Sequence, residues 1–208
     1  MSMPSNAPLR AALAETYLPE GAARILSAIL LVVAGSILLA IAAKVRVPFF
    51  PVPMTLQTLA VLAIAATYGS RLAVLTVVAY LAQGVMGLPV FTNTPPAVAG
   101  PAYLLGPTGG FLIGFVVMAF IVGKAADRGW GRSFAKMSGT MLAAEVVMMA
   151  LGFVWLAWFA TLSSGASGLG VAGAFSAGVA PFILGDLLKV LLAAAAVPAI
   201  WRLVDRLT

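Results

Sequence analysis

The stretch ILSAILLVVAGSILLAIAA, residues 25–43, contains 19 residues and no charged side chain. Three more uncharged stretches follow it, at residues 47–70, 72–123 and 146–185. A helix of about 20 mainly apolar residues is long enough to cross the hydrocarbon core of a bilayer. Only 18 of the 208 side chains are charged, 9% of the chain, against about 25% in soluble domains. This composition excludes a soluble domain and predicts an all-α integral membrane protein.

Helix-breaking segments divide the two longest stretches. Residues 87–110 contain five prolines, which is typical of a loop, and residues 163–178 are rich in glycine and serine, which is typical of a turn or of a short, weakly helical connection. We therefore expect a single transmembrane domain over residues 1–208, with an N-terminal tail at 1–21 and loops between the helices. The six transmembrane helices are predicted at 22–43, 54–69, 71–88, 107–124, 137–160 and 179–203.

The distribution of lysine and arginine predicts the orientation. Six spans place nine of these residues on one side of the membrane and two, Lys44 and Arg46, on the other. The side richer in positive charge is cytoplasmic, so both termini are expected in the cytoplasm of a multi-pass protein of the cytoplasmic membrane. The pI of about 10.2 then reflects this topology and an attraction to membrane lipids. Basic residues are not interleaved with aromatic ones, so no nucleic-acid partner is expected.

Three ionisable side chains fall inside predicted helices: Glu145, Asp186 and Lys189. Charges inside a membrane are costly and often mark a functional site. Asp186 and Lys189, three residues apart on one helix, can simply neutralise each other, or they can form the floor of a pocket that opens outward. For Glu145 we favour a structural hydrogen bond to a neighbouring helix over contact with a ligand.

Two predicted outer segments have unusual composition. VPFFPVP, residues 47–53, contains three prolines that fix an extended path, and it leads into Gln57 in the first turn of the next helix. It is either a rigid connector or a wall over an outward-facing site. Irregular segments as long as residues 87–110 are uncommon unless they have a function such as covering a ligand.

Several kinds of chemistry are absent from the sequence. Without Cys or His, the commonest zinc ligands, thiol catalysis and the Ser-His-Asp arrangement are missing, so we expect no enzyme, no metal site and no cofactor. GPTGG at 106–110 lacks the lysine of an ATP-binding P-loop. Together with Gly114, Ala119 and Gly123, its last glycine instead predicts a ridge of small residues for close helix packing.

Four sequence blocks resemble the BioY family, the biotin-binding S components of energy-coupling-factor transporters. They are PVPMTLQTLAVL (51–62), YLAQGVMGLPVF (80–91), GPTGGFLIGF (106–115) and GDLLK (185–189). The resemblance implies a six-helix membrane protein that captures biotin from outside. It also implies a transmembrane coupling subunit and two cytoplasmic ATPase subunits as partners, which agrees with the missing P-loop, although transport by the protein alone is an open alternative for this family. Ala34, Gly35, Ser36 and Ala40 of the first helix are candidates for the surface that contacts such a partner.

The resemblance also implies roles for individual residues. Asp186 would accept hydrogen bonds from the ureido N–H groups of biotin, and Asn93 would complete recognition of the ureido group. Lys189 would pair with the carboxylate of biotin, helped by the Tyr103 hydroxyl, and Gln57 is a further polar candidate. The walls would come from Phe49, Phe50, Phe91 or Trp155.

Two other classes of function predict different behaviour. An ion-coupled secondary transporter of a small carboxylate-bearing ligand would use Asp186 and Glu145 as a proton relay, and its uptake would stop when the proton gradient is removed. An intramembrane enzyme would convert its ligand and not merely retain it.

Overall fold

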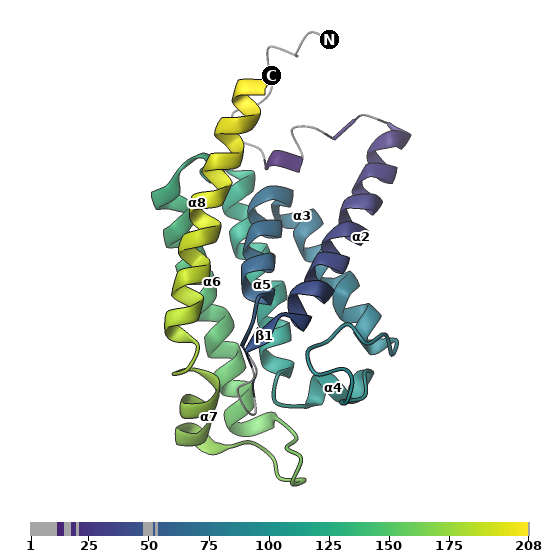
Figure 1. Ribbon diagram of the computed structural model, residues 1–208, viewed down its shortest axis with the longest axis vertical. Coiled ribbons are helices and arrows are strands. Elements are labelled where there is room, and N and C mark those ends of the chain that lie inside the picture. Colours follow the sequence, from purple (N-terminus) through teal and green to yellow (C-terminus); the bar gives the residue numbers. More distant parts are fainter. Residues whose placement is uncertain (1–11, 15–17, 20, 48–51, 53, 208) are drawn as a thin grey trace.

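The computed structural model describes residues 12–14, 18–19, 21–47, 52 and 54–207. The predicted tail lies mostly outside these residues, as do Phe49 and Phe50. The long helices lie side by side, and the start of α2 and the end of α8 lie at the same end of the bundle (Figure 1). The elements of regular structure are α2 (Ala22–Lys44), β1 (Arg46–Val47), β2 (Met54–Thr55), α3 (Gln57–Val85), α4 (Pro101–Leu105), α5 (Gly109–Asp127), a 3-10 turn (Trp130–Arg132), α6 (Phe134–Val154), a π-helical turn (Trp155–Phe159), α7 (Gly170–Gly178) and α8 (Ile183–Leu207).

Helix α3 is a hairpin of two helical arms that meet at Gly69. The backbone of Gly69 has φ 78° and ψ 173°, which is not helical. Gln57 and Tyr80 would lie about 35 Å apart along a straight helix, yet their side chains are joined by a hydrogen bond of 2.9 Å. The chain must therefore reverse between them, at the break predicted between the helices at 54–69 and 71–88.

The turn at Gly69 is held by Asp127 at the end of α5. The carboxylate of Asp127 accepts hydrogen bonds from the backbone N–H of Ser70 at 3.2 Å and from its hydroxyl at 2.6 Å. A carboxylate at this position satisfies free N–H groups at the start of the second arm. Gly69 has little room for a side chain, because an added Cβ would lie 2.4 Å from Oδ1 of Asp127.

Five helices among the described residues are long and apolar enough to cross a membrane: α2, α3, α5, α6 with its π-helical turn, and α8. Eight large apolar side chains of α2 are exposed, Ile25 at 67% among them, which fits contact with lipid and not with water. The protein is thus a multi-pass membrane protein. Six crossings stay a prediction, because each arm of α3 is shorter than the roughly 20 residues that a crossing needs.

Glycines on α5 allow its close packing against neighbouring helices. A Cβ added to Gly110 would lie 2.2 Å from Cβ of Trp155, and one added to Gly114 would lie 2.7 Å from Cγ of Met148 on α6. At Gly123 it would lie 2.5 Å from Cα of Ser70. The small-residue ridge predicted on this helix is therefore confirmed as a packing surface.

The segments between the predicted transmembrane helices contain regular structure, of which the sequence indicated only a short helical connection within residues 163–178. Strands β1 and β2 pair antiparallel, with Arg46 opposite Thr55, and so join the two ends of the proline-rich segment. Helix α7 forms within the glycine- and serine-rich stretch, where Ala174 is fully buried. Packing against the bundle outweighs the weak helix propensity of this composition. The short helix α4 lies in the long predicted loop, and α8 begins at Ile183, four residues later than predicted.

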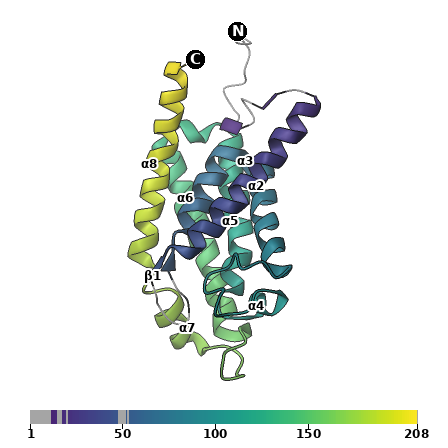
Figure 2. The same cartoon turned by 45° about the vertical axis from the view of Figure 1, so that its right-hand side comes forward.

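The surface suggested for a partner on the first helix is wrong in part. Figure 2 shows α2 running obliquely across the bundle. Gly35 and Ser36 face inward: a Cβ added to Gly35 would lie 2.6 Å from Cγ2 of Thr76, and the hydroxyl of Ser36 accepts a hydrogen bond from Gln83 at 3.0 Å. Among the four candidates only Ala34 is exposed. The small residues serve the contact between α2 and α3.

Candidate ligand-binding site

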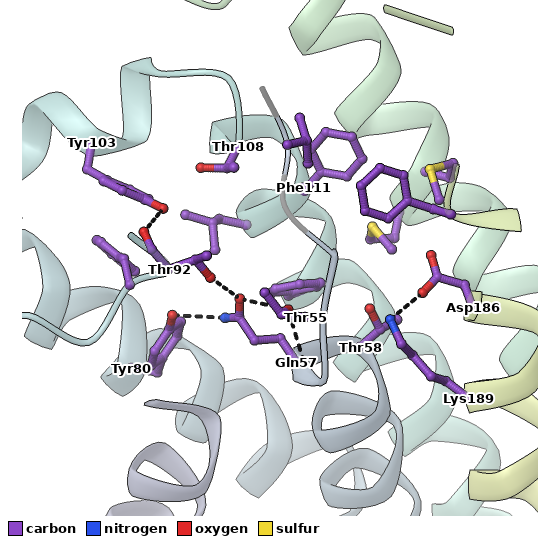
Figure 3. Close-up of a pocket in the computed structure, with 17 residues that line it drawn as sticks. Thr55, Gln57, Thr58, Tyr80, Thr92, Tyr103, Thr108, Phe111, Asp186 and Lys189 are labelled. Atoms are coloured by element: carbon purple, nitrogen blue, oxygen red, sulfur yellow. Dashed lines mark hydrogen bonds and ion pairs between the residues drawn. The ribbon is translucent and has the colours of Figure 1, made fainter. Parts of the chain in front are cut away.

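A pocket lies between α3, α5, α6 and α8, beside the segment that precedes α4 (Figure 3). Its free volume is about 50 Å³, which has room for a few water molecules. Two groups of polar side chains lie on opposite sides of it (Figure 3). The apolar walls between them are formed by Val52, Phe91, Phe111, Leu112, Phe115, Met148, Met149 and Phe182.

The first group, which we call the charged pole, consists of Asp186 and Lys189 on α8. Oδ1 of Asp186 accepts a hydrogen bond of 2.8 Å from Nζ of Lys189, and the two residues are only 3% and 7% exposed. The pairing that their spacing predicts is confirmed. An ion pair in so dry a place is stable only while both charges are satisfied, and both residues line the pocket. A ligand in the pocket can therefore form a hydrogen bond with Asp186 or with Lys189 in place of part of their bond to each other.

The second group, which we call the hydroxyl pole, consists of Thr55, Gln57, Tyr80, Thr92 and Tyr103. The amide of Gln57 donates to the Tyr80 hydroxyl at 2.9 Å, and its oxygen accepts from the hydroxyls of Thr92 at 3.1 Å and Thr55 at 3.2 Å. The hydroxyl of Tyr103 donates to the carbonyl of Thr92 at 2.6 Å. The network joins three segments that are far apart in the sequence. Each of its hydroxyls already donates its one proton within the protein, so a ligand that takes a hydrogen bond from one of them must replace an internal bond.

Tyr103 remains a neutral hydrogen-bond donor over a wide pH range. Burial raises the pKa of its hydroxyl above the ordinary value near 10, and this effect outweighs the opposing effects of Thr108 and of the Arg46 charge. Arg46 is thus close enough to act on the hydroxyl pole. A positive charge here favours an anionic group on a ligand.

Lys44 at the end of α2 holds the segment that carries Thr92. Its Nζ donates to the carbonyl of Phe91 at 2.7 Å and to the carbonyl of Thr94. The ring of Phe91 stacks on Tyr103 with centroids 4.6 Å apart. Sequence reasoning missed this role of Lys44, although the residue is one of only two cations predicted on the outer side.

The structure brings four of the five predicted site residues to one pocket: Gln57, Tyr103, Asp186 and Lys189. Asn93 is not among the lining residues. It has a φ of 62°, and its neighbour Thr92 lines the pocket instead. Of the predicted wall residues, Phe91 lines the pocket, whereas Trp155 donates its indole N–H to the carbonyl of Gly106 at 2.9 Å.

Several lining residues were not singled out from the sequence. Tyr80 belongs to a block that carried the family resemblance, so its place in that block was a usable signal. Four threonines that line the pocket gave no signal, because a threonine hydroxyl commonly bonds nearby backbone wherever it lies in the chain. They are Thr55, Thr58, Thr92 and Thr108.

Glu145 lies outside this pocket. It lines a lateral apolar groove between α6, α7 and α8, together with Asp186. Neither of its carboxyl oxygens accepts a hydrogen bond from any described residue. The bond to a neighbouring helix favoured for Glu145 thus has no donor among the described residues; a bond to Asp186 on α8 requires that one of the two carboxyl groups carry a proton.

The bundle defines a multi-pass membrane protein, and its pocket carries polar groups at two opposite poles. The chain belongs to the BioY family, whose sequence model matches residues 13–206. The family resemblance of the four sequence blocks is thereby confirmed.

Individual relatives cover most of the chain. It is 35% identical to the biotin transporter BioY of Thermotoga maritima over 157 aligned residues. The alignment covers 76% of this chain and 85% of the relative. With the biotin transporter BioY2 of Lactococcus lactis it shares 30% identity over 167 residues, or 78% and 83% of the two chains. A crystal structure of the S-component for biotin from an ECF-type ABC transporter superposes with a TM-score of 0.71 over 88% of this chain and 95% of the other, at 20% identity. This last likeness shows the shared fold.

Proposed function

We propose that this protein binds biotin with high affinity at the outer side of the cytoplasmic membrane, as the S component of an energy-coupling-factor transporter. The observation that carries the proposal is the placing of a buried ion pair at one end of the pocket and a network of hydroxyl and amide groups at the other. Because the free volume is only about 50 Å³, the proposal includes a widening of the pocket when biotin binds. Biotin has a matching pair of polar ends, a cyclic urea and a carboxylate, joined by an apolar body. The relatives named as biotin transporters support the same ligand.

The geometry favours a revised assignment of the two ends. The family resemblance implies that the two members of the ion pair contact different ends of biotin: Asp186 would bind the urea and Lys189 the carboxylate. These two side chains are 2.8 Å apart at one pole, so they meet the same end of an extended ligand. A urea offers N–H donors and a carbonyl acceptor, and Asp186 and Lys189 supply one acceptor and one donor. We therefore assign both residues to the urea.

The carboxylate is then assigned to the hydroxyl pole. Tyr103 keeps the role implied by the resemblance, supported by the charge of Arg46. Asn93 follows Thr92 directly, so it belongs to this end and not to the urea. Gln57 donates one amide N–H to Tyr80 and accepts from Thr92 through its oxygen, so its second amide N–H is available to the ligand. Discrimination follows because an analogue that lacks either end leaves buried polar groups unpaired.

The methyl ester of biotin tests this orientation. Esterification removes the negative charge, so Tyr103→Phe should weaken binding of biotin more than binding of the ester. Lys189→Met should weaken both ligands by the same factor. If Lys189→Met instead affects biotin alone, Lys189 reads the carboxylate and the revised assignment is wrong.

Uptake is proposed to need a transmembrane coupling subunit and two ATPase subunits, because the sequence carries no P-loop. Proteoliposomes that contain this chain with or without those subunits give the test. Accumulation of labelled biotin should require the ATPases and ATP, and it should persist when a protonophore removes the proton gradient. Uptake by this chain alone that stops with the protonophore would instead support an ion-coupled secondary transporter.

A further inference from the structure

The wall between the ligand pocket and the lateral groove contains Asp186, which lines both cavities. On the groove side stands Glu145, a carboxyl group that is 7% exposed. The rest of the groove is lined by apolar side chains from α6, α7 and α8. Glu145 therefore lies in a medium of low dielectric, where an unpaired charge is strongly disfavoured.

The polar surroundings of Glu145 contain no donor that suits an ionised carboxylate. No described residue donates a hydrogen bond to either oxygen. The charged groups that act on it are Asp186 and Lys189, both from α8, and Lys189 already donates to Asp186. Helix α7 carries no ionisable side chain, and those of α5, Lys124 and Asp127, lie in its last turn at the far end of the bundle.

The charge balance of this cluster decides the state of Glu145. With Glu145 ionised, two carboxylates would stand beside one lysine, leaving a buried negative charge without a partner. With Glu145 protonated, the cluster is neutral. Two carboxyl groups can form a hydrogen bond to each other only when one of them carries a proton. The proton on Glu145 satisfies both conditions.

We infer that Glu145 is a proton-binding site coupled to the ligand pocket: it carries a proton that it shares with Asp186, and loss of this proton weakens binding of the ligand. The link is direct, because Asp186 lines the ligand pocket and also lines the lateral groove together with Glu145, on which it acts. Ionised Glu145 competes with the ligand for Lys189, which the proposed orientation places at the urea. Linkage is reciprocal, so a bound ligand holds the proton more tightly by the same factor.

The ligand-free protein tests the proton itself. Infrared spectra of the wild type at neutral pH should contain a carboxylic acid C=O band that disappears in Glu145→Gln. The band should shift in Asp186→Asn, because the partner that shares the proton has changed. The control is Asp205→Asn, which alters an exposed carboxylate near the end of α8 that pairs with Arg132. The band should be the same in this variant as in the wild type. A wild-type spectrum that does not differ from that of Glu145→Gln would overturn the inference.

The coupling to the ligand rests on the proposed binding of biotin. Biotin affinity of the wild type should fall at least about fivefold from mildly acidic to alkaline pH, a typical coupling between two sites. Glu145→Gln keeps the volume and a donor for Asp186, so its affinity should match the acidic wild type and lose this dependence. Equal pH profiles for the two proteins would overturn the coupling. If the wild type binds no biotin, the proposed function fails, whereas the infrared result still decides the state of Glu145.

Discussion

The amide nitrogen of Gln57 and the hydroxyl oxygen of Tyr80 lie 2.9 Å apart, although 23 residues separate them in the sequence. This bond closes the two arms of α3 on each other at the ligand pocket. The helical hairpin at Gly69 and the hydroxyl pole are therefore parts of one arrangement. Changes at this bond should affect stability and ligand binding together.

Tyr80→Phe removes the acceptor of the Gln57 amide without changing the shape of the ring. Leaving a buried amide N–H unpaired should lower the free energy of unfolding by about 1–3 kcal/mol. Biotin affinity should fall as well, because Gln57 loses its fixed orientation. Thermal unfolding in detergent and a biotin titration measure the two effects. A variant as stable as the wild type would contradict the role of this bond.

Lys44→Met should loosen the segment that carries Thr92. Hydrogen bonds from a charged group contribute about 1.5–3 kcal/mol each, and two of them reach the carbonyls of Phe91 and Thr94. We expect dissociation of labelled biotin to become at least about tenfold faster, because 1.4 kcal/mol corresponds to a factor of ten. Lys124→Met, at the far end of α5, is the matched control and should leave the rate unchanged. Equal rates for both variants would show that Lys44 does not hold the site.

Gly84→Ala should displace the ring of Phe91, because an added Cβ would lie 2.0 Å from its Cζ. Overpacking of this kind costs about 1–3 kcal/mol. Gly139 on α6 offers a control, since nothing lies within 4 Å of its added Cβ. Gly139→Ala should be neutral or slightly stabilising, because alanine favours a helix. Melting temperatures compare the two, and a stable Gly84→Ala protein would contradict the close contact.

Because Tyr103 is buried, we expect the free energy of unfolding to fall at high pH. Its pKa is raised in the folded protein by burial, so the folded state keeps a proton that the unfolded state loses near pH 10. Its contribution to stability is complete below that pH and is lost as the pH rises toward the folded pKa. Melting temperatures should fall above about pH 10, and less so for Tyr103→Phe. Identical profiles for the two proteins would place Tyr103 in contact with water.

The sequence predicted the long helices well, because long uncharged stretches divided by helix-breaking segments leave few alternatives in a membrane. Asp186 and Lys189 could be predicted as site residues for a related reason, since charged side chains are rare among the apolar residues of a membrane helix. The hydroxyl pole was only partly predictable. Thr92 and Tyr80 meet Gln57 through the fold of α3 and of the irregular segment before α4, and no local pattern encodes that meeting. That Gly35 and Ser36 face the interior of the bundle also depends on how α2 packs, which the sequence does not show.

The central claim is that Asp186 and Lys189 read the ligand, and a calorimetric titration of the purified protein with biotin tests it most directly. The wild type should show saturable binding at or below micromolar biotin. Asp186→Asn and Lys189→Met should each weaken it by about 2–5 kcal/mol, the effect of breaking a buried charged contact, while Asp205→Asn should bind like the wild type. Unfolding curves of the ligand-free variants verify that they fold. Folded variants that bind biotin as tightly as the wild type, or a wild type that shows no saturable binding, would contradict the account.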